Sequence, residues 1–262
     1  RLLAAFNHLH IFLDPDPDTE KAAAERSRLF AIAGREAGWN CYDTSLISEG
    51  GGVFDRKTKE VALSPEARAM LGLRSDEVVS GDQVIRAIVA EAPLYVPAMP
   101  GTGKPMSVRM TNCGALGWVT DKERGYRYQD VHPQTGRPWP AIPSELMDLW
   151  ENLAGYDKPP EACLVNFYSD DAKMGLHQDK DEETFDAPVV SVSLGDTATF
   201  RVGGTTRKSP TRSFRLASGD VVVLGGEARL AYHGIDRILP GTSTLLKNGG
   251  RINLTLRRVK PA

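Results

Sequence analysis

Two histidines and one aspartate in this sequence have the types and spacing of a metal-binding set. His177 and Asp179 flank a single glutamine, and His233 follows 56 residues after His177 in a chain that holds only five histidines. Two imidazoles and a carboxylate on one side of an ion leave its other side open, as in non-haem Fe(II) oxygenases. Zinc is the alternative, because a catalytic zinc site also takes three protein ligands. We expect neutral imidazoles and an ionised carboxylate as the ligand forms.

A segment near the C-terminus carries polar residues at every second position, namely Arg251, Asn253, Thr255 and Arg257. Side chains alternate between the two faces of a strand, so these four share one face. Two arginines on a buried face near a metal need anionic partners, which a dicarboxylic acid would supply. This requirement favours iron over zinc, because zinc hydrolysis needs no bound dicarboxylate. The alternative is a row of surface charges on a strand whose other face is buried.

Two further candidate groups lie upstream. Trp118, Tyr126 and Tyr128 fall in a segment where basic residues are interspersed with aromatic rings. Such rings stack on nucleobases while basic groups pair with phosphates, although a hydrophobic core explains any single aromatic equally well. Asn166 and Tyr168 share one face of a short apolar strand, and alone they are ordinary strand residues.

Composition sets limits on the class of protein. The chain has 262 residues, enough for one large domain or two smaller ones, with 41% hydrophobic and 25% charged residues, as in ordinary globular proteins. Residues 1–85 carry 10 Lys+Arg and 14 Asp+Glu, and the remainder carries 22 and 20, a weak basic excess that neither demands nor excludes a nucleic-acid partner. Three widely spaced cysteines suit a reducing cytoplasm rather than a disulfide scaffold. No apolar run approaches the length of a membrane span, and no signal peptide is visible.

The expected elements differ between the two halves. Before about residue 85 the pattern is α/β, with an apolar strand over 2–13, a helix over 19–33 and a short helix from Ser64. Residues 93–105 indicate an irregular loop rich in Pro and Gly, and a helix is expected over 142–154. Later short strands separated by glycine turns indicate an all-β sandwich or barrel. These strands are expected over 163–168, 189–194, 199–202, 213–216, 220–224 and 251–258.

The first part of the chain resembles the large bacterial NAD-specific glutamate dehydrogenases. The matching stretches are AAFNHLHIFLDPDPD (4–18), YDTSLISEGGGVFDRKTKEVALSPEAR (42–68) and VIRAI (84–88). In that family the strand ending in Asp follows a Gly-rich phosphate turn, and this sequence shows no such turn before it. The resemblance therefore implies an incomplete, inactive α/β segment over residues 1–85. Asp14 is expected at a turn, and the alternative is a contact with a ribose hydroxyl.

The second part, about residues 89–262, is similar to the AlkB family of Fe(II)/2-oxoglutarate-dependent nucleic-acid dealkylases. The similarity is carried by MSVRMTNCGALGW (106–118), NFYSDDAKMGLHQDKDE (166–182), APVVSVSLGDTATFRVGG (187–204), GDVVVLGGEARLAYHGI (219–235) and RINLTLR (251–257). It implies a mainly β dioxygenase domain over 86–262, with a nucleotide-recognition lid over about 93–158. The core over about 159–262 would be a double-stranded β-helix, or jelly roll. The two parts would join near Ile85–Ala92, where both resemblances run through one helix.

The resemblance also implies roles for single residues. Iron would be bound by His177, Asp179 and His233. The co-substrate 2-oxoglutarate would be bound by Asn166, Tyr168, Arg251, Asn253 and Arg257. Arg251 would pair with the carboxylate at the tail of the co-substrate, and Arg257 would lie near the iron-bound end.

Five more residues would bind the nucleic acid. Trp118 would stack on the damaged base opposite His177, and Asp181 would accept a hydrogen bond from its exocyclic amine. Two tyrosines would hold phosphates, and an arginine would line the mouth of the site: Tyr126, Tyr128 and Arg207. Two departures from the family are Leu224, where relatives can carry Trp, and a slightly longer loop at 121–124.

The implied activity is oxidative demethylation of bases such as 1-methyladenine and 3-methylcytosine in DNA or RNA repair. It would use Fe(II), 2-oxoglutarate and O₂, and would release formaldehyde, succinate and CO₂. The base would be flipped out of the stack, and the positive charge of such lesions would favour a nearby carboxylate. We expect a monomer that stays active without residues 1–82. The alternatives are an NAD-dependent dehydrogenase fragment, a catalytically dead nucleic-acid binder, and a hydroxylase of small molecules or proteins.

Overall fold

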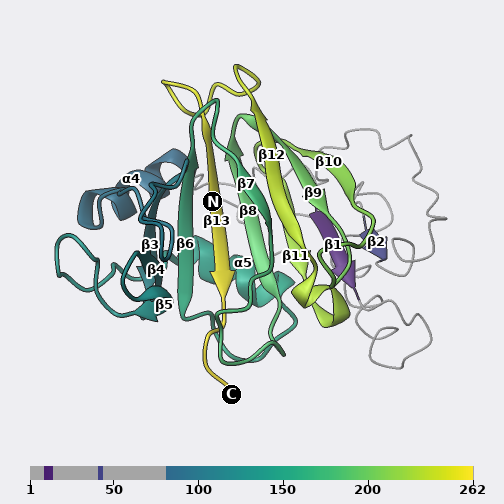
Figure 1. Ribbon diagram of the computed structural model, residues 1–262, viewed down its shortest axis with the longest axis horizontal. Helices are drawn as coiled ribbons and strands as arrows, with labels where there is room; N and C mark the ends of the chain where they lie inside the picture. Colours follow the sequence, from purple (N-terminus) through teal and green to yellow (C-terminus); the bar gives the residue numbers. More distant parts are fainter. Residues whose placement is uncertain (1–8, 14–40, 44–80, 262) are drawn as a thin grey trace.

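The computed structural model describes residues 9–13, 41–43 and 81–261, which build two facing β-sheets, a hairpin and flanking helices (Figure 1). The larger sheet has the strand order β2 (Cys41–Asp43), β1 (Leu9–Leu13), β11 (Val221–Leu224), β8 (Val189–Gly195), β13 (Arg251–Arg257), β6 (Ala162–Tyr168) and β3 (Arg109–Gly114). The smaller sheet has the order β10 (Arg212–Leu216), β9 (Thr197–Val202), β12 (His233–Leu239) and β7 (Met174–His177). The hairpin consists of β4 (Gly117–Asp121) and β5 (Gly125–Gln129).

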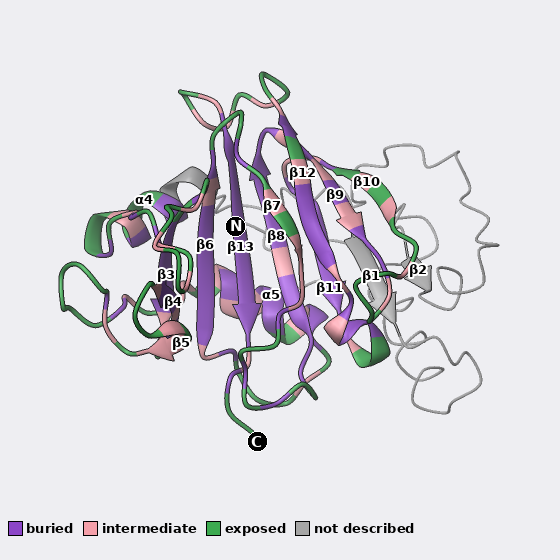
Figure 2. Cartoon of the chain, in the orientation of Figure 1, coloured by how far each residue is buried: buried purple, intermediate pink, exposed green. Residues whose placement is uncertain are grey.

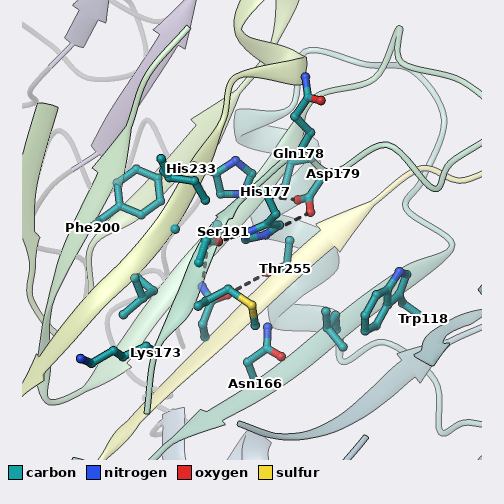
Figure 3. A pocket seen from close by; sticks show the side chains of 18 of the residues that line it. Trp118, Asn166, Lys173, His177, Gln178, Asp179, Ser191, Phe200, His233 and Thr255 are labelled. Carbon is teal, nitrogen blue, oxygen red and sulfur yellow. Dashed lines mark hydrogen bonds and ion pairs between the residues drawn. The ribbon is translucent and has the colours of Figure 1, made fainter. Parts of the chain in front are cut away.

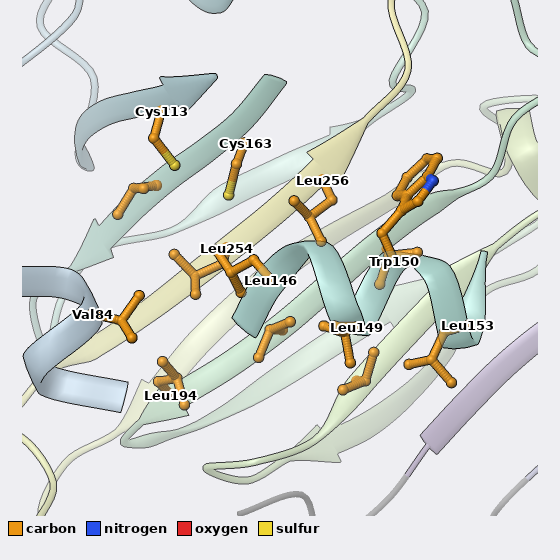
Figure 4. Packing of buried hydrophobic residues seen from close by; sticks show 14 of the residues in the cluster. Val84, Cys113, Leu146, Leu149, Trp150, Leu153, Cys163, Leu194, Leu254 and Leu256 are labelled. Atoms are coloured by element: carbon orange, nitrogen blue, oxygen red, sulfur yellow. The ribbon is translucent and has the colours of Figure 1, made fainter. Parts of the chain in front are cut away.

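Two helices cover the outer face of the larger sheet. Helix α4 (Gly81–Glu91) contributes Val84 and Ile88, and α5 (Ser144–Leu153) contributes Leu149 and Trp150, to one cluster with the side chains of β8, β11 and β13 (Figure 4). The inner face packs against the smaller sheet through a second cluster. A sheet buried on both faces favours continuous apolar strands, as in β11, whose four residues are all buried.

Strand β13 shows how this packing produces the site. Ile252, Leu254 and Leu256 point into the cluster under the helices (Figure 4). The alternate residues, from Arg251 to Arg257, therefore face the space between the two sheets, and every residue of the strand is buried (Figure 2). The predicted alternation of β13 is confirmed, and its arginines lie inside the protein rather than on its surface.

Most of the predicted elements in the described part are present. The helix expected over 142–154 is α5, and the six strands expected beyond residue 162 are β6, β8, β9, β10, β11 and β13. Six strands were missed: β2, β3, β4, β5, β7 and β12. The register of β12 shifts within both of its pairings, which breaks the regular alternation that identifies a strand in sequence. The helices expected over 19–33 and from Ser64 lie outside the described residues.

The described pieces of the N-terminal part join the larger sheet. Strand β1 pairs in parallel with β11 on one side and with β2 on the other. At the opposite edge β3 pairs with β6, so β3 and α5, which fall within the predicted lid range, belong to the core. The two-part division and the jelly-roll description stay predictions. No helix within the described residues has the length and apolar character needed to cross a membrane.

Candidate metal and co-substrate site

Three side chains converge at one end of the smaller sheet. His177 ends β7 and His233 begins β12, and the two residues are paired across these antiparallel strands. Their rings lie 4.5 Å apart, and their Nε2 atoms lie 3.7 and 3.8 Å from the two carboxylate oxygens of Asp179 (Figure 3). The possible ligand atoms of the three residues all lie within 4.8 Å of one another. This donor set fits Fe(II), because two imidazoles and one carboxylate are the ligands of non-haem Fe(II) oxygenases and lie close enough to share one ion.

Backbone carbonyls orient both imidazoles. The Nδ1 atom of His177 lies 2.9 Å from the carbonyl oxygen of Gly175, and the Nδ1 atom of His233 lies 2.9 Å from that of Ala231. A carbonyl can only accept, so each Nδ1 carries the proton in the neutral ring. The Nε2 lone pairs, which face Asp179, are then free for a metal ion.

Burial and neighbouring charges set the protonation states. Burial alone would raise the pKa of Asp179, but the Arg257 guanidinium, 2.8 Å away, and the two imidazoles hold it well below its usual range. Burial, together with the neighbouring His177, lowers the pKa of His233 to about 4. At neutral pH the carboxylate is ionised and His233 is neutral, which are the forms that bind a metal.

A chain of buried ion pairs continues behind the ligands. Arg257 contacts Asp179, and its Nε lies 3.6 Å from a carboxylate oxygen of Glu182. The other oxygen of Glu182 accepts from Arg229 at 3.1 Å, and Arg229 also donates to the backbone carbonyl of Asp179 at 2.7 Å. Charges of opposite sign thus alternate through a region that water does not reach, so each buried charge has a partner. Sequence reasoning missed Glu182 and Arg229, which carry no spacing signal.

The predicted co-substrate residues line one wall of the space between the sheets. Strands β6 and β13 are paired so that Asn166 lies opposite Asn253, and Tyr168 opposite Arg251. Arg251 donates from Nη2 to Ser193 Oγ at 2.7 Å. Burial lowers the pKa of Arg251 and raises that of Tyr168 to about 12, so the phenol is neutral and able to donate.

Open polar atoms on this wall fit a carboxylic acid. Within the described part of the chain, Nε and Nη1 of Arg251 and Oδ1 of Asn166 are buried without a hydrogen-bond partner. A buried guanidinium with only one of its three nitrogens bonded is costly unless an anion completes it. Asn253 is already fixed by bonds to Ser191 and from Thr255, which holds its side chain rigid in the wall. The wall therefore fits a carboxylate of 2-oxoglutarate at Arg251.

A cavity of about 630 Å³ joins the metal ligands, this wall and four of the five predicted substrate residues, all but Tyr128. Trp118 stacks on Tyr126 with ring centroids 5.3 Å apart, and its indole nitrogen donates to Asp181 at 2.7 Å. Arg207 also lines the cavity and donates to the carbonyl of Leu176 at 3.1 Å. Leu224, the departure from the AlkB family, lies in the apolar part of the lining.

Tyr128 is placed differently from its neighbour on β5. Its hydroxyl donates to Glu182 at 2.5 Å and accepts from Arg257 at 3.3 Å, whereas Tyr126 is exposed. A phenol enclosed beside a carboxylate is poorly placed for a phosphate, because the two anions repel. The phosphate-binding role therefore stays a prediction for Tyr126 alone. We interpret Tyr128 as a residue whose hydrogen bonds hold the hairpin against the site.

Comparisons with known proteins agree with this geometry. The pattern of the 2OG-Fe(II) oxygenase superfamily matches residues 79–257, and that of the catalytic domain of bacterial NAD-glutamate dehydrogenase matches residues 1–103. The alpha-ketoglutarate-dependent dioxygenase AlkB homolog of Caulobacter vibrioides is 64% identical over 160 residues, which are 61% of this chain and 72% of the relative. AlkB of Escherichia coli is 45% identical over 74% of this chain and 92% of its own length. The solved structure of OsALKBH1 superimposes with a TM-score of 0.56 at 32% identity, covering 68% of this chain and 92% of that one.

Proposed function

The chain belongs to the 2OG-Fe(II) oxygenase superfamily as an AlkB-type dioxygenase, and on that basis we propose that it removes N-alkyl groups from nucleic-acid bases by oxidation. One observation carries the proposal. A single cavity joins the His177–Asp179–His233 cluster, the open guanidinium of Arg251 and an aromatic wall formed by Trp118. A small-molecule hydroxylase would not need a stacking wall beside a carboxylate at the mouth. Release of formaldehyde from a methylated oligonucleotide tests the proposal.

The residues of the site would divide the chemistry as follows. His177, Asp179 and His233 would hold Fe(II), while Arg251 and Arg257 would hold 2-oxoglutarate. Bound together, iron and 2-oxoglutarate would activate O₂, the oxidant: one oxygen atom would enter succinate as 2-oxoglutarate loses CO₂, and the other would be inserted into a C–H bond of the N-methyl group. The resulting N-hydroxymethyl base then loses formaldehyde, and the ring nitrogen recovers its unalkylated form.

The mouth residues would position the base. Trp118 lines the cavity, and a flipped-out base would stack on its ring opposite His177. Asp181 has one carboxylate oxygen bonded to Trp118, which leaves the other for the exocyclic amine of the base. Bases methylated at N1 of adenine or N3 of cytosine carry a positive charge, which the same carboxylate would favour over a neutral base.

Replacing Asp181 by asparagine is expected to reduce selectivity for cationic lesions. The amide keeps the shape of the side chain and an acceptor for Trp118 but removes the negative charge. Because hydrogen bonds to charged groups are stronger than neutral ones, we expect kcat/KM for a 1-methyladenine oligonucleotide to fall about tenfold. An oligonucleotide with the neutral base N6-methyladenine is the matched substrate. Equal losses on both substrates would contradict a charge-based role for Asp181.

Removing residues 1–80 is expected to leave the activity intact. Among the described residues, those that line the cavity all lie between Met99 and Arg257, and this truncation keeps α4, whose Val84, Ile85 and Ile88 pack against the larger sheet. The deletion exposes the edge of β11 that β1 covers, so the oligomeric state should be measured alongside formaldehyde release. A folded, monomeric truncation without turnover would show that the N-terminal part contributes to the site.

A further inference from the structure

Gln178 lies between two of the proposed metal ligands, yet its side chain points away from them. In Figure 3 the side chain leaves the cluster formed by His177, Asp179 and His233. Its amide nitrogen donates to the backbone carbonyl of Leu230 at 2.7 Å and to that of Thr205 at 3.3 Å. The residue therefore joins segments that lie 52 and 27 positions away in the sequence.

The first of these bonds leads to the third ligand. Leu230 ends the short 3₁₀ helix η2 (Gly226–Leu230), and the carbonyl of the next residue, Ala231, fixes the imidazole of His233. A bond from Gln178 to Leu230 thus links the segment that carries His177 and Asp179 to the segment that carries His233. All three ligands are held relative to one another before any ion is present.

The second bond leads to the mouth of the cavity. Thr205 belongs to residues 203–211, which we call the mouth loop and which carry Arg207. This loop is also bonded at Gly203 and Gly204 to Tyr232, at 2.8 and 2.9 Å, and Arg207 donates to the carbonyl of Leu176. The mouth loop therefore contacts the backbone of Leu176 and Tyr232, the residues directly before the ligands His177 and His233.

The chemistry of these contacts requires an amide. A glutamine NH₂ group has two donor hydrogens, and here it meets two carbonyl oxygens, which can only accept. A glutamate at this position would place a carboxylate against both carbonyls, and a methionine would fill the space without donating.

We propose that Gln178 is a positioning residue that ties the mouth loop to the metal ligands, so that metal affinity and nucleic-acid affinity depend on the same amide. The inference rests on the proposed function for the identity of the substrate. Partners that orient metal ligands are typically worth about 10- to 100-fold in metal affinity or activity. We expect Gln178→Met to weaken Co(II) binding about tenfold or more and to weaken binding of a methylated oligonucleotide to the Co(II)-loaded protein. The affinity for 2-oxoglutarate should stay unchanged, because Arg251 has no contact with this network.

The test uses the full chain and Co(II), an inert and coloured substitute for Fe(II). Co(II) affinity is read from its absorption, and affinities for 2-oxoglutarate and the oligonucleotide are measured on the loaded protein. Gln134→Met, at an exposed position in the loop after β5, is the matched control. Gln178→Glu, which has the same shape, is the second variant should Gln178→Met fail to fold, and it should weaken both affinities as well.

The outcomes separate the inference from the proposed function. Folded Gln178 variants that bind Co(II) and the oligonucleotide as tightly as Gln134→Met would overturn the inference. A loss of 2-oxoglutarate affinity equal to the other losses would also overturn it, because it would show general damage to the site. The proposed function fails separately, when the unaltered chain releases no formaldehyde although it binds metal.

Discussion

Replacing His177 by alanine is expected to abolish metal-dependent turnover and leave the protein as stable as before. The variant removes one of three ligands, and two remaining ligands hold an ion weakly and without the required geometry. The His177 side chain is 39% exposed, and it bonds to the carbonyl of Gly175 two residues away, so its loss leaves no cavity in the core. Turnover, Co(II) affinity and the free energy of unfolding should be measured on the same sample.

His132 provides the matched control for this variant. It is also a histidine, but it is buried in the loop after β5, where its ring contacts Tyr95 and Trp139 and bonds to the carbonyl of Pro93 at 2.8 Å. We expect His132→Ala to lower the free energy of unfolding by about 1–3 kcal/mol and to keep metal affinity. His177→Ala should therefore lose metal affinity and keep its stability, whereas His132→Ala should lose stability and keep its metal affinity. Metal binding by His177→Ala equal to that of the unaltered chain would remove this residue from the ligand set.

The second large effect is expected from Arg251→Met, which should raise the 2-oxoglutarate concentration required for turnover. Truncating one member of a buried charge pair typically costs about 2–5 kcal/mol, which is roughly a 30-fold or greater loss of affinity. Titration of the anaerobic, metal-loaded protein with 2-oxoglutarate measures this loss of affinity. Arg251→Lys should recover little, because an ammonium cannot form the two parallel bonds of a guanidinium.

A stability measurement distinguishes a binding role for Arg251 from a structural one. In the described part of the chain two of its nitrogens are buried without partners, so the charge is costly until an anion binds. Without 2-oxoglutarate we expect Arg251→Met to unfold with a free energy no lower than that of the unaltered chain. Addition of 2-oxoglutarate should stabilise only the unaltered chain. Strong destabilisation of the unliganded variant would show that Arg251 holds the fold rather than the co-substrate.

The strands that were predicted best from the sequence are those in which each face has a single, uniform environment. Strand β11 is buried on both faces and reads as an apolar run, and β13 alternates because one face meets the helices and the other meets the cavity. Strands β4 and β5 form a separate two-stranded hairpin, and no residue of β7 is fully buried, so none of the three shows the pattern of a core strand. Whether these segments form strands depends on which distant segments bury them, and a local sequence pattern carries no information about that burial.

For the metal cluster, residue type and spacing predicted which side chains meet but not how they are held. The convergence of His177, Asp179 and His233 follows from the pairing of β7 with β12, and these strands were not predicted. The ion pair of Glu182 with Arg229 was missed because its members lie 47 residues apart and have no motif. The enclosure of the Tyr128 hydroxyl could not be predicted either, since it depends on where the hairpin packs.

The most direct test of the account is an anaerobic sample of the chain with Fe(II), 2-oxoglutarate and an oligonucleotide containing 1-methyladenine, followed by admission of O₂. Formaldehyde and succinate should appear in equal amounts, and omission of either Fe(II) or 2-oxoglutarate should stop both. Succinate without formaldehyde, in a sample shown to bind the oligonucleotide, would contradict the account, because the oxidation would then not reach the methylated base.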